Sequence, residues 1–229
     1  SLGVAVLIIV MSVMNGFRID LTNRIIGLNS HLNIFSFSEK ISTDEINQFI
    51  PRFDNYSYIE LYKTLETNGL IIKNNNSKGV LIKGYDEYNT RHYIFDKIIK
   101  GSLIQDNINE VIIGDSLAET LNIAIGDKIK IAIPKTDKTI LGNIPRFKTL
   151  EIIGIFDLGL YEYDSNLVFL KSNIVRKLLL YEESDYNKIE FFIDNPNEVE
   201  IFKNILDQNI FKSNSNLFTV SWKEINQPL

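Results

Sequence analysis

The chain has 229 residues, 45% of them hydrophobic, which is enough for one large domain or two small ones with a packed core. Its 24 basic and 29 acidic residues give a net charge of -5, which argues against nonspecific nucleic-acid binding. The absence of cysteine excludes disulfides, thiolate nucleophiles and cysteine-ligated metal sites.

The amino-terminal segment, residues 2–14, is apolar almost throughout and would place apolar side chains on every face of a helix. A bilayer-spanning helix needs about 20 such residues, so we interpret the segment as the end of a transmembrane helix. It has no initiating Met and no basic flank, so a cleavable signal peptide fits poorly. A buried core helix or pair of strands is the alternative, because apolar runs of this length also occur inside soluble proteins.

The next residues predict an amphipathic extension of that helix, because Phe17, Leu21, Ile25 and Leu28 recur at helical spacing. Alternation predicts a strand over residues 31–37. The Ser-Thr-Asp-Glu sequence at residues 42–45 is a capping box and predicts a short helix that ends before Pro51.

Strands and short helices alternate through the middle of the chain. The predicted strands are residues 58–65, 70–73, 79–85, 110–113, 128–133 and 149–156, with a turn at residues 74–77. A helical turn is expected over residues 95–100, and a helix after Gly114 presents Leu117, Ala118 and Leu121 on one face and ends at Asn122. Residues 134–148 form a polar excursion between two antiparallel strands.

The last third repeats the same kinds of element, which makes the chain an α+β protein. We expect strands at residues 166–170, 188–193 and 218–222, and a helix that Ser172 caps and that runs to Tyr181. Asn195 and Pro196 predict the start of a further helix that reaches about Gln208.

Enzymatic motifs are missing from the sequence. It contains no phosphate-binding loop, no dinucleotide fingerprint, no H-E-x-x-H and no G-x-S-x-G. His31 and His92 lie far apart and have no carboxylate at metal-ligand spacing. Asp157, Glu162 and Asp164 do not match a calcium loop, so a solvated turn is the preferred interpretation. We therefore expect no catalytic residues, no metal and no cofactor.

Four segments of the sequence resemble the LolC and LolE permeases of lipoprotein-releasing ABC transporters and their MacB-like periplasmic core domain. The octapeptide V-M-S-V-M-N-G-F, residues 10–17, is similar to the end of the first transmembrane helix in that family. Residues 114–127 resemble the family's G-x-x-L-A-x-x-L segment, and L-G-N-I-P-R at 141–146 resembles its M-G-R-I-P-S stretch. The tryptophan-containing S-W-K-E, residues 221–224, resembles the segment before the second membrane helix.

This resemblance implies a fold and a domain division. Residues 1–30 would be the end of the first transmembrane helix and its extension. Residues 31–85 and 185–225 would form a porter-like α+β subdomain, and residues 86–184 an inserted β-rich Sabre-like subdomain that carries a hook at 134–145.

The resemblance also implies a function and partners. A permease of this kind sits in the bacterial inner membrane with this domain in the periplasm, releases lipoproteins from the membrane and passes them to a LolA-type chaperone. A LolD-type ATPase would be a separate subunit, and a second permease would complete a homodimer or heterodimer. A MacB- or FtsX-type efflux or signalling permease, or a non-transport extracytoplasmic interaction module, remains the alternative. A LolC-like and a LolE-like role both stay open, as does the cargo.

In the family, the hook docks the chaperone above a pad of polar and basic residues. Lys138, Arg146 and Lys148 flank the hook, and Ile140 and Asn143 stand where a proline and an arginine are expected. An ordinary surface hairpin is the alternative. The residues assigned to the hook are Ile140, Leu141, Gly142, Asn143, Ile144 and Pro145, those assigned to the pad are Lys130, Phe147 and Lys148, and those assigned to lipid or lipoprotein contact are Val10, Val13 and Met14.

Overall fold

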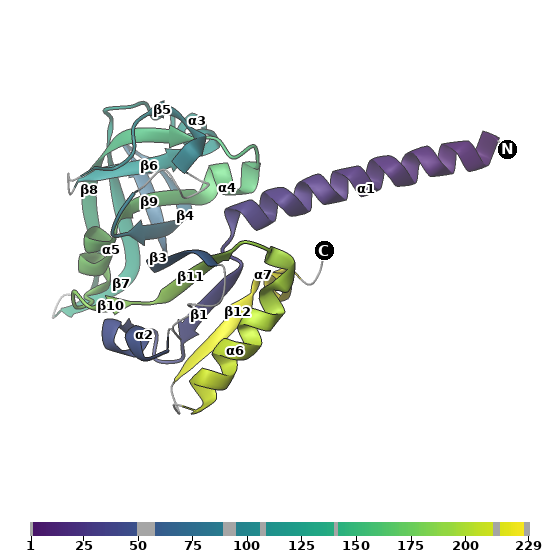
Figure 1. The fold of residues 1–229 in the computed structure, drawn as a ribbon. Helices are drawn as coiled ribbons and strands as arrows, with labels where there is room; N and C mark the ends of the chain where they lie inside the picture. The colour runs from purple at the N-terminus through teal and green to yellow at the C-terminus, as the bar shows by residue number, and fades with distance from the viewer. Residues whose placement is uncertain are drawn as a thin grey trace.

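A long amino-terminal helix projects from a two-lobed body in the computed structural model of the chain (Figure 1). The structure describes residues 2–49, 58–88, 95–105, 109–139, 142–212 and 216–226. The carboxy-terminal end of the described chain lies on the side of the body from which the helix departs (Figure 1). The carboxy-terminal segment is therefore close to the root of the helix, whereas the amino terminus lies at its far tip (Figure 1).

The helices and strands have the following bounds. The helices are α1 (Leu2–Leu28), α2 (Thr43–Phe49), α3 (Asp115–Leu121), α4 (Tyr161–Asn166), α5 (Ser172–Leu179), α6 (Val199–Lys212) and α7 (Trp222–Ile225), with 3-10 turns at Phe95–Lys97 and Pro196–Glu198. The strands are β1 (Leu32–Ser36), β2 (Ile41–Ser42), β3 (Tyr58–Lys73), β4 (Asn76–Tyr85), β5 (Ile98–Gly101), β6 (Glu110–Gly114), β7 (Lys128–Thr139), β8 (Gly142–Phe156), β9 (Leu167–Lys171), β10 (Asp185–Tyr186), β11 (Lys188–Ile193) and β12 (Leu217–Ser221).

One lobe is a four-stranded antiparallel sheet in the order β12-β1-β11-β3. Side chains alternate along β12: Leu217, Thr219 and Ser221 are buried, whereas Phe218 and Val220 are half-buried. Helix α6 packs on β12 and also contacts α2. This arrangement follows the two-residue period of a strand with one face covered.

The other lobe is a closed barrel. Among the described residues, six strands pair in a ring: β3 with β4, β4 with β9, β9 with β6, β6 with β8, β8 with β7, and β7 again with β3. The closing contact aligns Ile71 with Ile131. A Cβ atom on neighbouring Gly69 would lie 2.8 Å from the Ala132 carbonyl oxygen, so glycine permits this close approach.

Strand β3 belongs to both lobes. Its first half, from Tyr58 to Thr64, pairs with β11 of the sheet, and its second half, from Thr64 to Lys73, pairs with β4 of the barrel. The lobes also share one large hydrophobic cluster, in which Leu65 and Ile71 are fully buried. A second cluster, around Tyr85, Phe156 and Phe169, includes residues of β4, β6 and β9 that alternate with those of the first cluster and therefore lie on the opposite face of these strands.

Several local predictions are confirmed. The capping box at α2 is present, because Glu45 accepts from the Ser42 amide at 2.9 Å and Ser42 Oγ accepts from the Glu45 amide at 3.2 Å. Helix α3 buries Leu117, Ala118 and Leu121, and Asn122 follows it in the left-handed conformation.

Other boundaries were wrong. The expected strands 58–65 and 70–73 are one continuous strand, because the polar residues between them pair in register with β4. Residues 98–101 form β5 rather than helix, since they pair with β8. Ser172 is the first residue of α5 and not its cap, and its hydroxyl hydrogen bonds with the Asp86 carboxylate instead.

Candidate functional site

The predicted hook is the outer end of a two-stranded ribbon formed by β7 and β8. The strands pair from Lys128 opposite Glu151 to Thr139 opposite Gly142, with a register shift between Ile133 and Thr136. The shift falls at Pro134, which has no amide hydrogen to contribute to the ladder. Ile140 and Leu141 lie outside the described residues, and the side chains of Gly142, Asn143, Ile144 and Pro145 are not described.

Two of the three pad residues lie together at the base of this ribbon. The Lys130 ammonium is 5.7 Å from the centroid of the Phe147 ring, which is within the range of a cation–π contact. Phe147 is 62% exposed, so most of its apolar surface faces solvent. The pair therefore presents an apolar ring and a positive charge on one surface.

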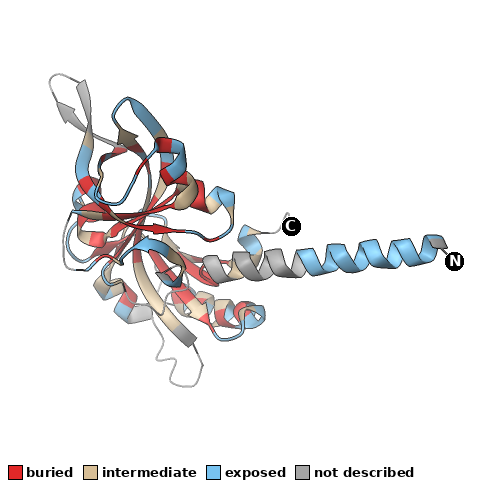
Figure 2. Ribbon diagram, turned by 90° about the horizontal axis from the view of Figure 1, so that it is seen from above, coloured by how far each residue is buried: buried red, intermediate tan, exposed pale blue. Residues whose placement is uncertain are grey.

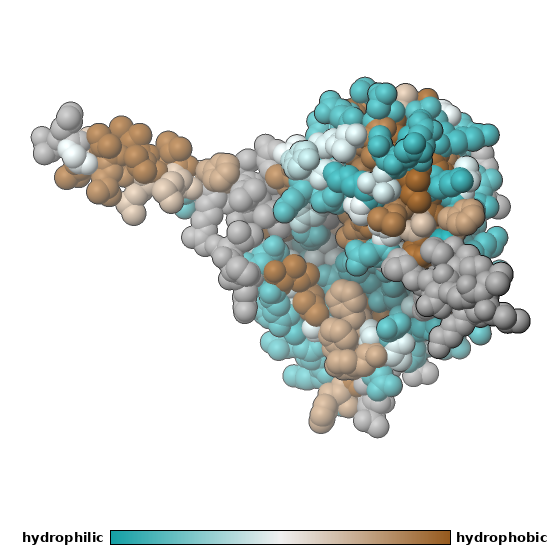
Figure 3. All heavy atoms as spheres, turned by 180° about the vertical axis from the view of Figure 1, so that it is seen from behind, coloured by the Kyte–Doolittle hydropathy of each residue, from teal (hydrophilic) through white to brown (hydrophobic). Residues whose placement is uncertain are grey.

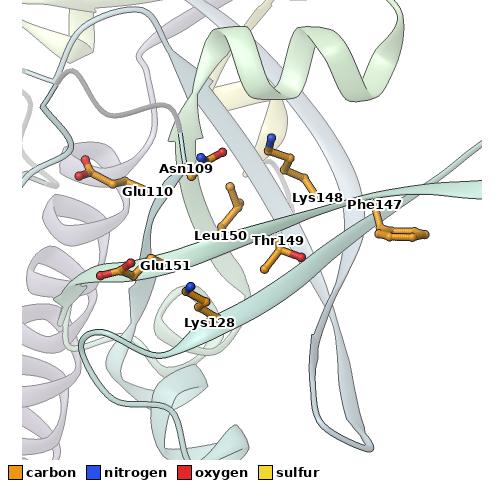
Figure 4. Close-up of a pocket in the computed structure, with 8 residues that line it drawn as sticks. All are labelled: Asn109, Glu110, Lys128, Phe147, Lys148, Thr149, Leu150 and Glu151. Carbon is orange, nitrogen blue, oxygen red and sulfur yellow. The ribbon is translucent and has the colours of Figure 1, made fainter.

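Lys148 lies on the opposite face of β8. It pairs in register with Ile131, whereas Phe147 pairs with Ala132, and successive residues of a strand point to opposite sides. Figure 4 shows the Phe147 and Lys148 side chains pointing away from each other. The pad predicted from sequence position is thus divided between the two faces of the ribbon.

Arg146 does not contribute a free charge at the ribbon. The side chain is half-buried, and its Nη1 donates to the carbonyl oxygen of Leu178 at 2.9 Å. Because Leu178 belongs to the last turn of α5, this hydrogen bond fastens the base of the ribbon to that helix. Arg146 lies in β8 at the base of the hook, as the sequence position predicts, and its guanidinium is engaged with α5.

A surface hollow of about 540 Å³ lies beside the base of the ribbon (Figure 4). It opens where β6 begins and where the Glu151 amide donates to the Asn109 carbonyl at 2.8 Å. Within the described residues, β8 has no strand partner on this edge before Glu151. The lining residues are Asn109, Glu110, Lys128, Phe147, Lys148, Thr149, Leu150 and Glu151.

The hollow was not predicted from the sequence. Asn109 and Glu110 are some forty positions before the β8 residues that line the hollow, and the parallel pairing of β6 with β8 brings them together. Two carboxylates and two lysines line it beside one exposed aromatic ring. This mixture suits the polar backbone of a peptide or protein partner better than a small apolar ligand.

A buried charge network at the junction of the two lobes was also missed. Glu190 on β11 is 1% exposed, and its carboxylate lies 3.0 Å from the ammonium groups of both Lys83 and Lys188. Tyr85 donates to the same carboxylate at 2.7 Å. Glu66 completes the network, 2.9 Å from Lys188 and 3.5 Å from Lys83.

The network shifts the pKa values of Glu190 and Lys83. Burial acts to raise the pKa of Glu190, but the two lysines outweigh burial and hold that pKa well below its usual range. Burial acts to lower the pKa of Lys83, but Glu190 and Glu66 raise it above its ordinary value. Glu190 and Lys83 therefore stay ionised near pH 7, and the network connects β3 and β4 of the barrel to β11 of the sheet.

The amino-terminal helix α1 projects into solvent. The side chains of residues 3–17 are exposed, with Val10 at 51% and Val13 and Met14 at 67% (Figure 2). Figure 3 shows apolar residues all along this projecting part. Ile8 and Ile9 are equally exposed, so exposure does not single out the three predicted lipid contacts. Among the described residues, no helix has an apolar stretch long enough to cross a bilayer.

Deleting residues 1–15 should leave the thermal transition of the body almost unchanged. The side chains of residues 3–15 are exposed, so the midpoint is expected to move by less than about 2 °C, which corresponds to roughly 0.5–1 kcal/mol. Circular dichroism melting of the parent and the shortened chain in the same detergent measures this. A fall of about 10 °C would contradict the exposed position of the helix.

The acidic residues after β8 stabilise a loop. The Asp164 carboxylate accepts from the amides of Leu158 at 2.8 Å and Leu160 at 3.0 Å. Burial raises the pKa of Asp164.

Within the described ranges, no group of three His, Cys, Asp or Glu residues could hold a metal ion. His92 lies outside those ranges.

The described structure is an α+β domain. It has one strand shared by two lobes, a closed barrel, and an exposed apolar helix at its amino terminus. The chain belongs to the MacB-like periplasmic core domain family, whose family model matches residues 1–208. The crystal structure of the periplasmic region of MacB from Actinobacillus actinomycetemcomitans has the same fold, with a TM-score of 0.54 at 17% identity over 88% of this chain and 94% of that one. The expected fold class is confirmed.

The curated relatives identify a narrower group within this family. The lipoprotein-releasing system transmembrane protein LolC of Neisseria meningitidis serogroup B is 25% identical over 73% of this chain and 41% of its own length. LolC of Buchnera aphidicola subsp. Acyrthosiphon pisum is 25% identical over 97% of this chain and 54% of its own length. The resemblance to LolC-type proteins is confirmed, and the chain spans about half the length of these relatives.

Proposed function

We propose that this chain is the extracytoplasmic domain of a permease subunit in an ABC transporter that releases lipoproteins from the bacterial inner membrane. The observation that carries the proposal is the similarity to LolC over nearly the whole chain, including the exposed apolar helix. The domain would lie in the periplasm, and α1 would continue the first membrane helix, with Val10, Val13 and Met14 in contact with lipid or lipoprotein.

The chemistry of transport would lie in other subunits. A LolD-type ATPase would hydrolyse ATP, and a second permease, identical or different, would complete the transporter. The lack of a phosphate-binding loop in the sequence supports a separate ATPase. In this proposal the chain itself is not an enzyme and guides lipoprotein cargo toward a periplasmic chaperone.

We place the chaperone contact on the β7–β8 ribbon. The hook residues 140–145 would insert into the chaperone, and Lys130 and Phe147 would support it on one face. Lys148 would contact it from the other face, beside the hollow. Burial of one exposed apolar side chain contributes about 1.5–3 kcal/mol, whereas a rim charge contributes roughly 0–1 kcal/mol and mainly raises the association rate. Apolar contact should therefore dominate the affinity.

The domain division remains part of the proposal. Strands β1, β11 and β12 fall in the porter-like residues 31–85 and 185–225, and strands β5 to β9 fall in the Sabre-like residues 86–184. Strand β4, on the porter-like side of this boundary, pairs with β9 of the barrel. Limited proteolysis tests the boundary at residue 85: because β3 and β4 complete the ring with β7 and β9, protection of this position from cleavage would argue against it.

Replacing both Ile140 and Leu141 by Ser should weaken binding to the organism's own LolA-type chaperone by at least about tenfold, because two apolar contacts are lost. Surface plasmon resonance with the purified chaperone measures this. Lys148→Ala should instead change mainly the salt dependence of the association rate.

The matched control is Phe211→Ser, which removes an exposed aromatic side chain from α6, 87% exposed and outside the ribbon. It should leave chaperone binding unchanged. Binding of the double Ser variant with parental affinity, while its melting is also parental, would refute the hook assignment.

A further inference from the structure

The root of α1 lies next to β1 and the carboxy-terminal segment. Only residues 29–31 separate the last residue of α1, Leu28, from β1. Strand β1 pairs with β12, and α7 follows β12 directly, so the carboxy-terminal segment begins beside the root of α1 (Figure 1). The segment that enters the body and the segment that leaves it therefore meet.

His31 holds these segments together through its backbone. Its amide donates to the carbonyl of Phe191 on β11 at 2.8 Å. Its own carbonyl accepts from the amide of Trp222, the first residue of α7, at 2.9 Å. The residue is buried, with 6% of its surface exposed.

The imidazole makes a second set of contacts. Nδ1 accepts from the Ile193 amide at 2.9 Å, and the ring packs edge-on against Phe192 with 5.6 Å between centroids. The backbone of Ile26, in the last turn of α1, lies close enough to the ring to act on its pKa in the direction opposite to burial. Burial lowers the pKa of His31, so the ring is neutral near pH 7 and Nδ1 is free to accept.

Among the residues whose side chains the structure describes, two parts of the helix region bear on its direction. The side chains of residues 3–17 are exposed and touch nothing that could set its direction. One further tie joins the root to the barrel: Asn29 Nδ2 donates to the hydroxyl of Tyr163 on α4 at 2.9 Å. The described contacts at the root are therefore those of His31 and Asn29, and a tilt of α1 about its root would strain them.

We propose that His31 is a positioning residue that fixes the direction in which α1 leaves the body and couples α1 to β11 and α7. The imidazole bridges the last turn of the helix and the end of β11, while the main chain of the same residue holds α7. The inference concerns the geometry of this chain and does not depend on the proposed transport function.

Three substitutions separate the contacts of the ring. His31→Phe keeps a ring against Phe192 but removes both hydrogen-bonding nitrogens. His31→Asn keeps a polar atom near the position of Nδ1, and His31→Gln keeps one near the position of Nε2. Tyr163→Phe is the control, because it removes only the tie to Asn29.

Two measurements on the full chain in detergent micelles test the proposal. Double electron–electron resonance between spin labels at Ile9 on α1 and Asn204 on α6 reports the direction of the helix, and the chain has no cysteine to interfere with labelling. Hydrogen exchange of the Ile193 amide reports its bond to the ring. Exchange in His31→Phe should be faster by about tenfold, the effect of losing one buried hydrogen bond.

The expected pattern is a clearly broader distance distribution in His31→Phe than in Tyr163→Phe. Protection of Ile193 should be kept in His31→Asn and lost in His31→Gln. A parental distance distribution together with parental exchange in His31→Phe would overturn the proposal. If His31→Phe does not fold, the Asn and Gln variants decide: equal Ile193 protection in both would overturn it.

Discussion

We expect Glu190→Gln to lower the free energy of unfolding by about 3–5 kcal/mol, because removing one partner of a buried ion network leaves uncompensated charge. The substitution keeps the side-chain shape but leaves Lys83 and Lys188 with Glu66 as the one remaining anion of the network. Urea unfolding followed by far-ultraviolet circular dichroism measures the loss.

The matched control is Lys100→Gln. Lys100 pairs with Asp115 at 3.7 Å, but its side chain is 62% exposed, so the loss should be roughly 0–1 kcal/mol. Replacing Lys83 and Glu190 together by Met should cost less than the sum of the single changes, since no charge of this pair remains unpaired. A loss below about 1 kcal/mol in Glu190→Gln would show that the network contributes little.

The same network predicts acid sensitivity. The pKa of Glu190 is held well below its ordinary value of 4.5 in the folded chain. A depressed folded pKa gives stability that is fully present above the unfolded pKa and is lost as pH falls below it toward the folded pKa. The parent should therefore lose stability more steeply than Glu190→Gln below about pH 4.5. Parallel urea midpoints for the two proteins from pH 6 to pH 3 would contradict the assignment.

Gly114→Ala should be the next most damaging change. An added Cβ would lie 2.1 Å from the Asp164 carbonyl oxygen and 2.6 Å from its carbonyl carbon, both main-chain atoms that cannot rotate away. Because α3 starts at the next residue and packs on α4, the two helices would have to separate. Overpacking of this kind costs typically about 1–3 kcal/mol, which urea unfolding measures.

Gly79→Ala provides the comparison on β4, where an added Cβ meets nothing within 4 Å. It should be neutral or stabilise by up to about 1 kcal/mol, because alanine loses less backbone freedom than glycine on entering a strand. Equal stability of the two alanine variants would mean that α3 and α4 do not pack as closely as the structure places them.

Local signals predicted much of the secondary structure. The reciprocal hydrogen bonds of Ser42 and Glu45, and the left-handed Asn122 after α3, depend on residues within one helical turn. Such contacts can be recognised in the sequence because their partners are adjacent. The continuity of β3 could not be predicted, since its polar middle is held by pairing with β4 rather than by its own hydrophobic pattern.

The candidate site was predictable only in part, for the same reason. The position of the ribbon followed from two flanking strands and two prolines, and its family resemblance supplied the proposed role. The separation of Phe147 from Lys148 follows from strand alternation, but the hollow needs β6 beside β8. The charge network joins Lys83 to a carboxylate 107 positions later, and no local pattern marks such a pair as buried.

The continuous β3 strand restricts how this domain can recombine with its relatives. Residues 86–184 contain the barrel strands β6 to β9, but the ring also needs β3 and β4, which precede them in the chain. A segment exchanged at residue 85 would bring only β6 to β9 of the ring. These strands would then have to pair with the β3 and β4 of a different protein. An exchange that leaves the ring intact must begin before β3 and end after β9. The exchanged segment would then include residues 58–64 of β3, which pair with β11 of the sheet.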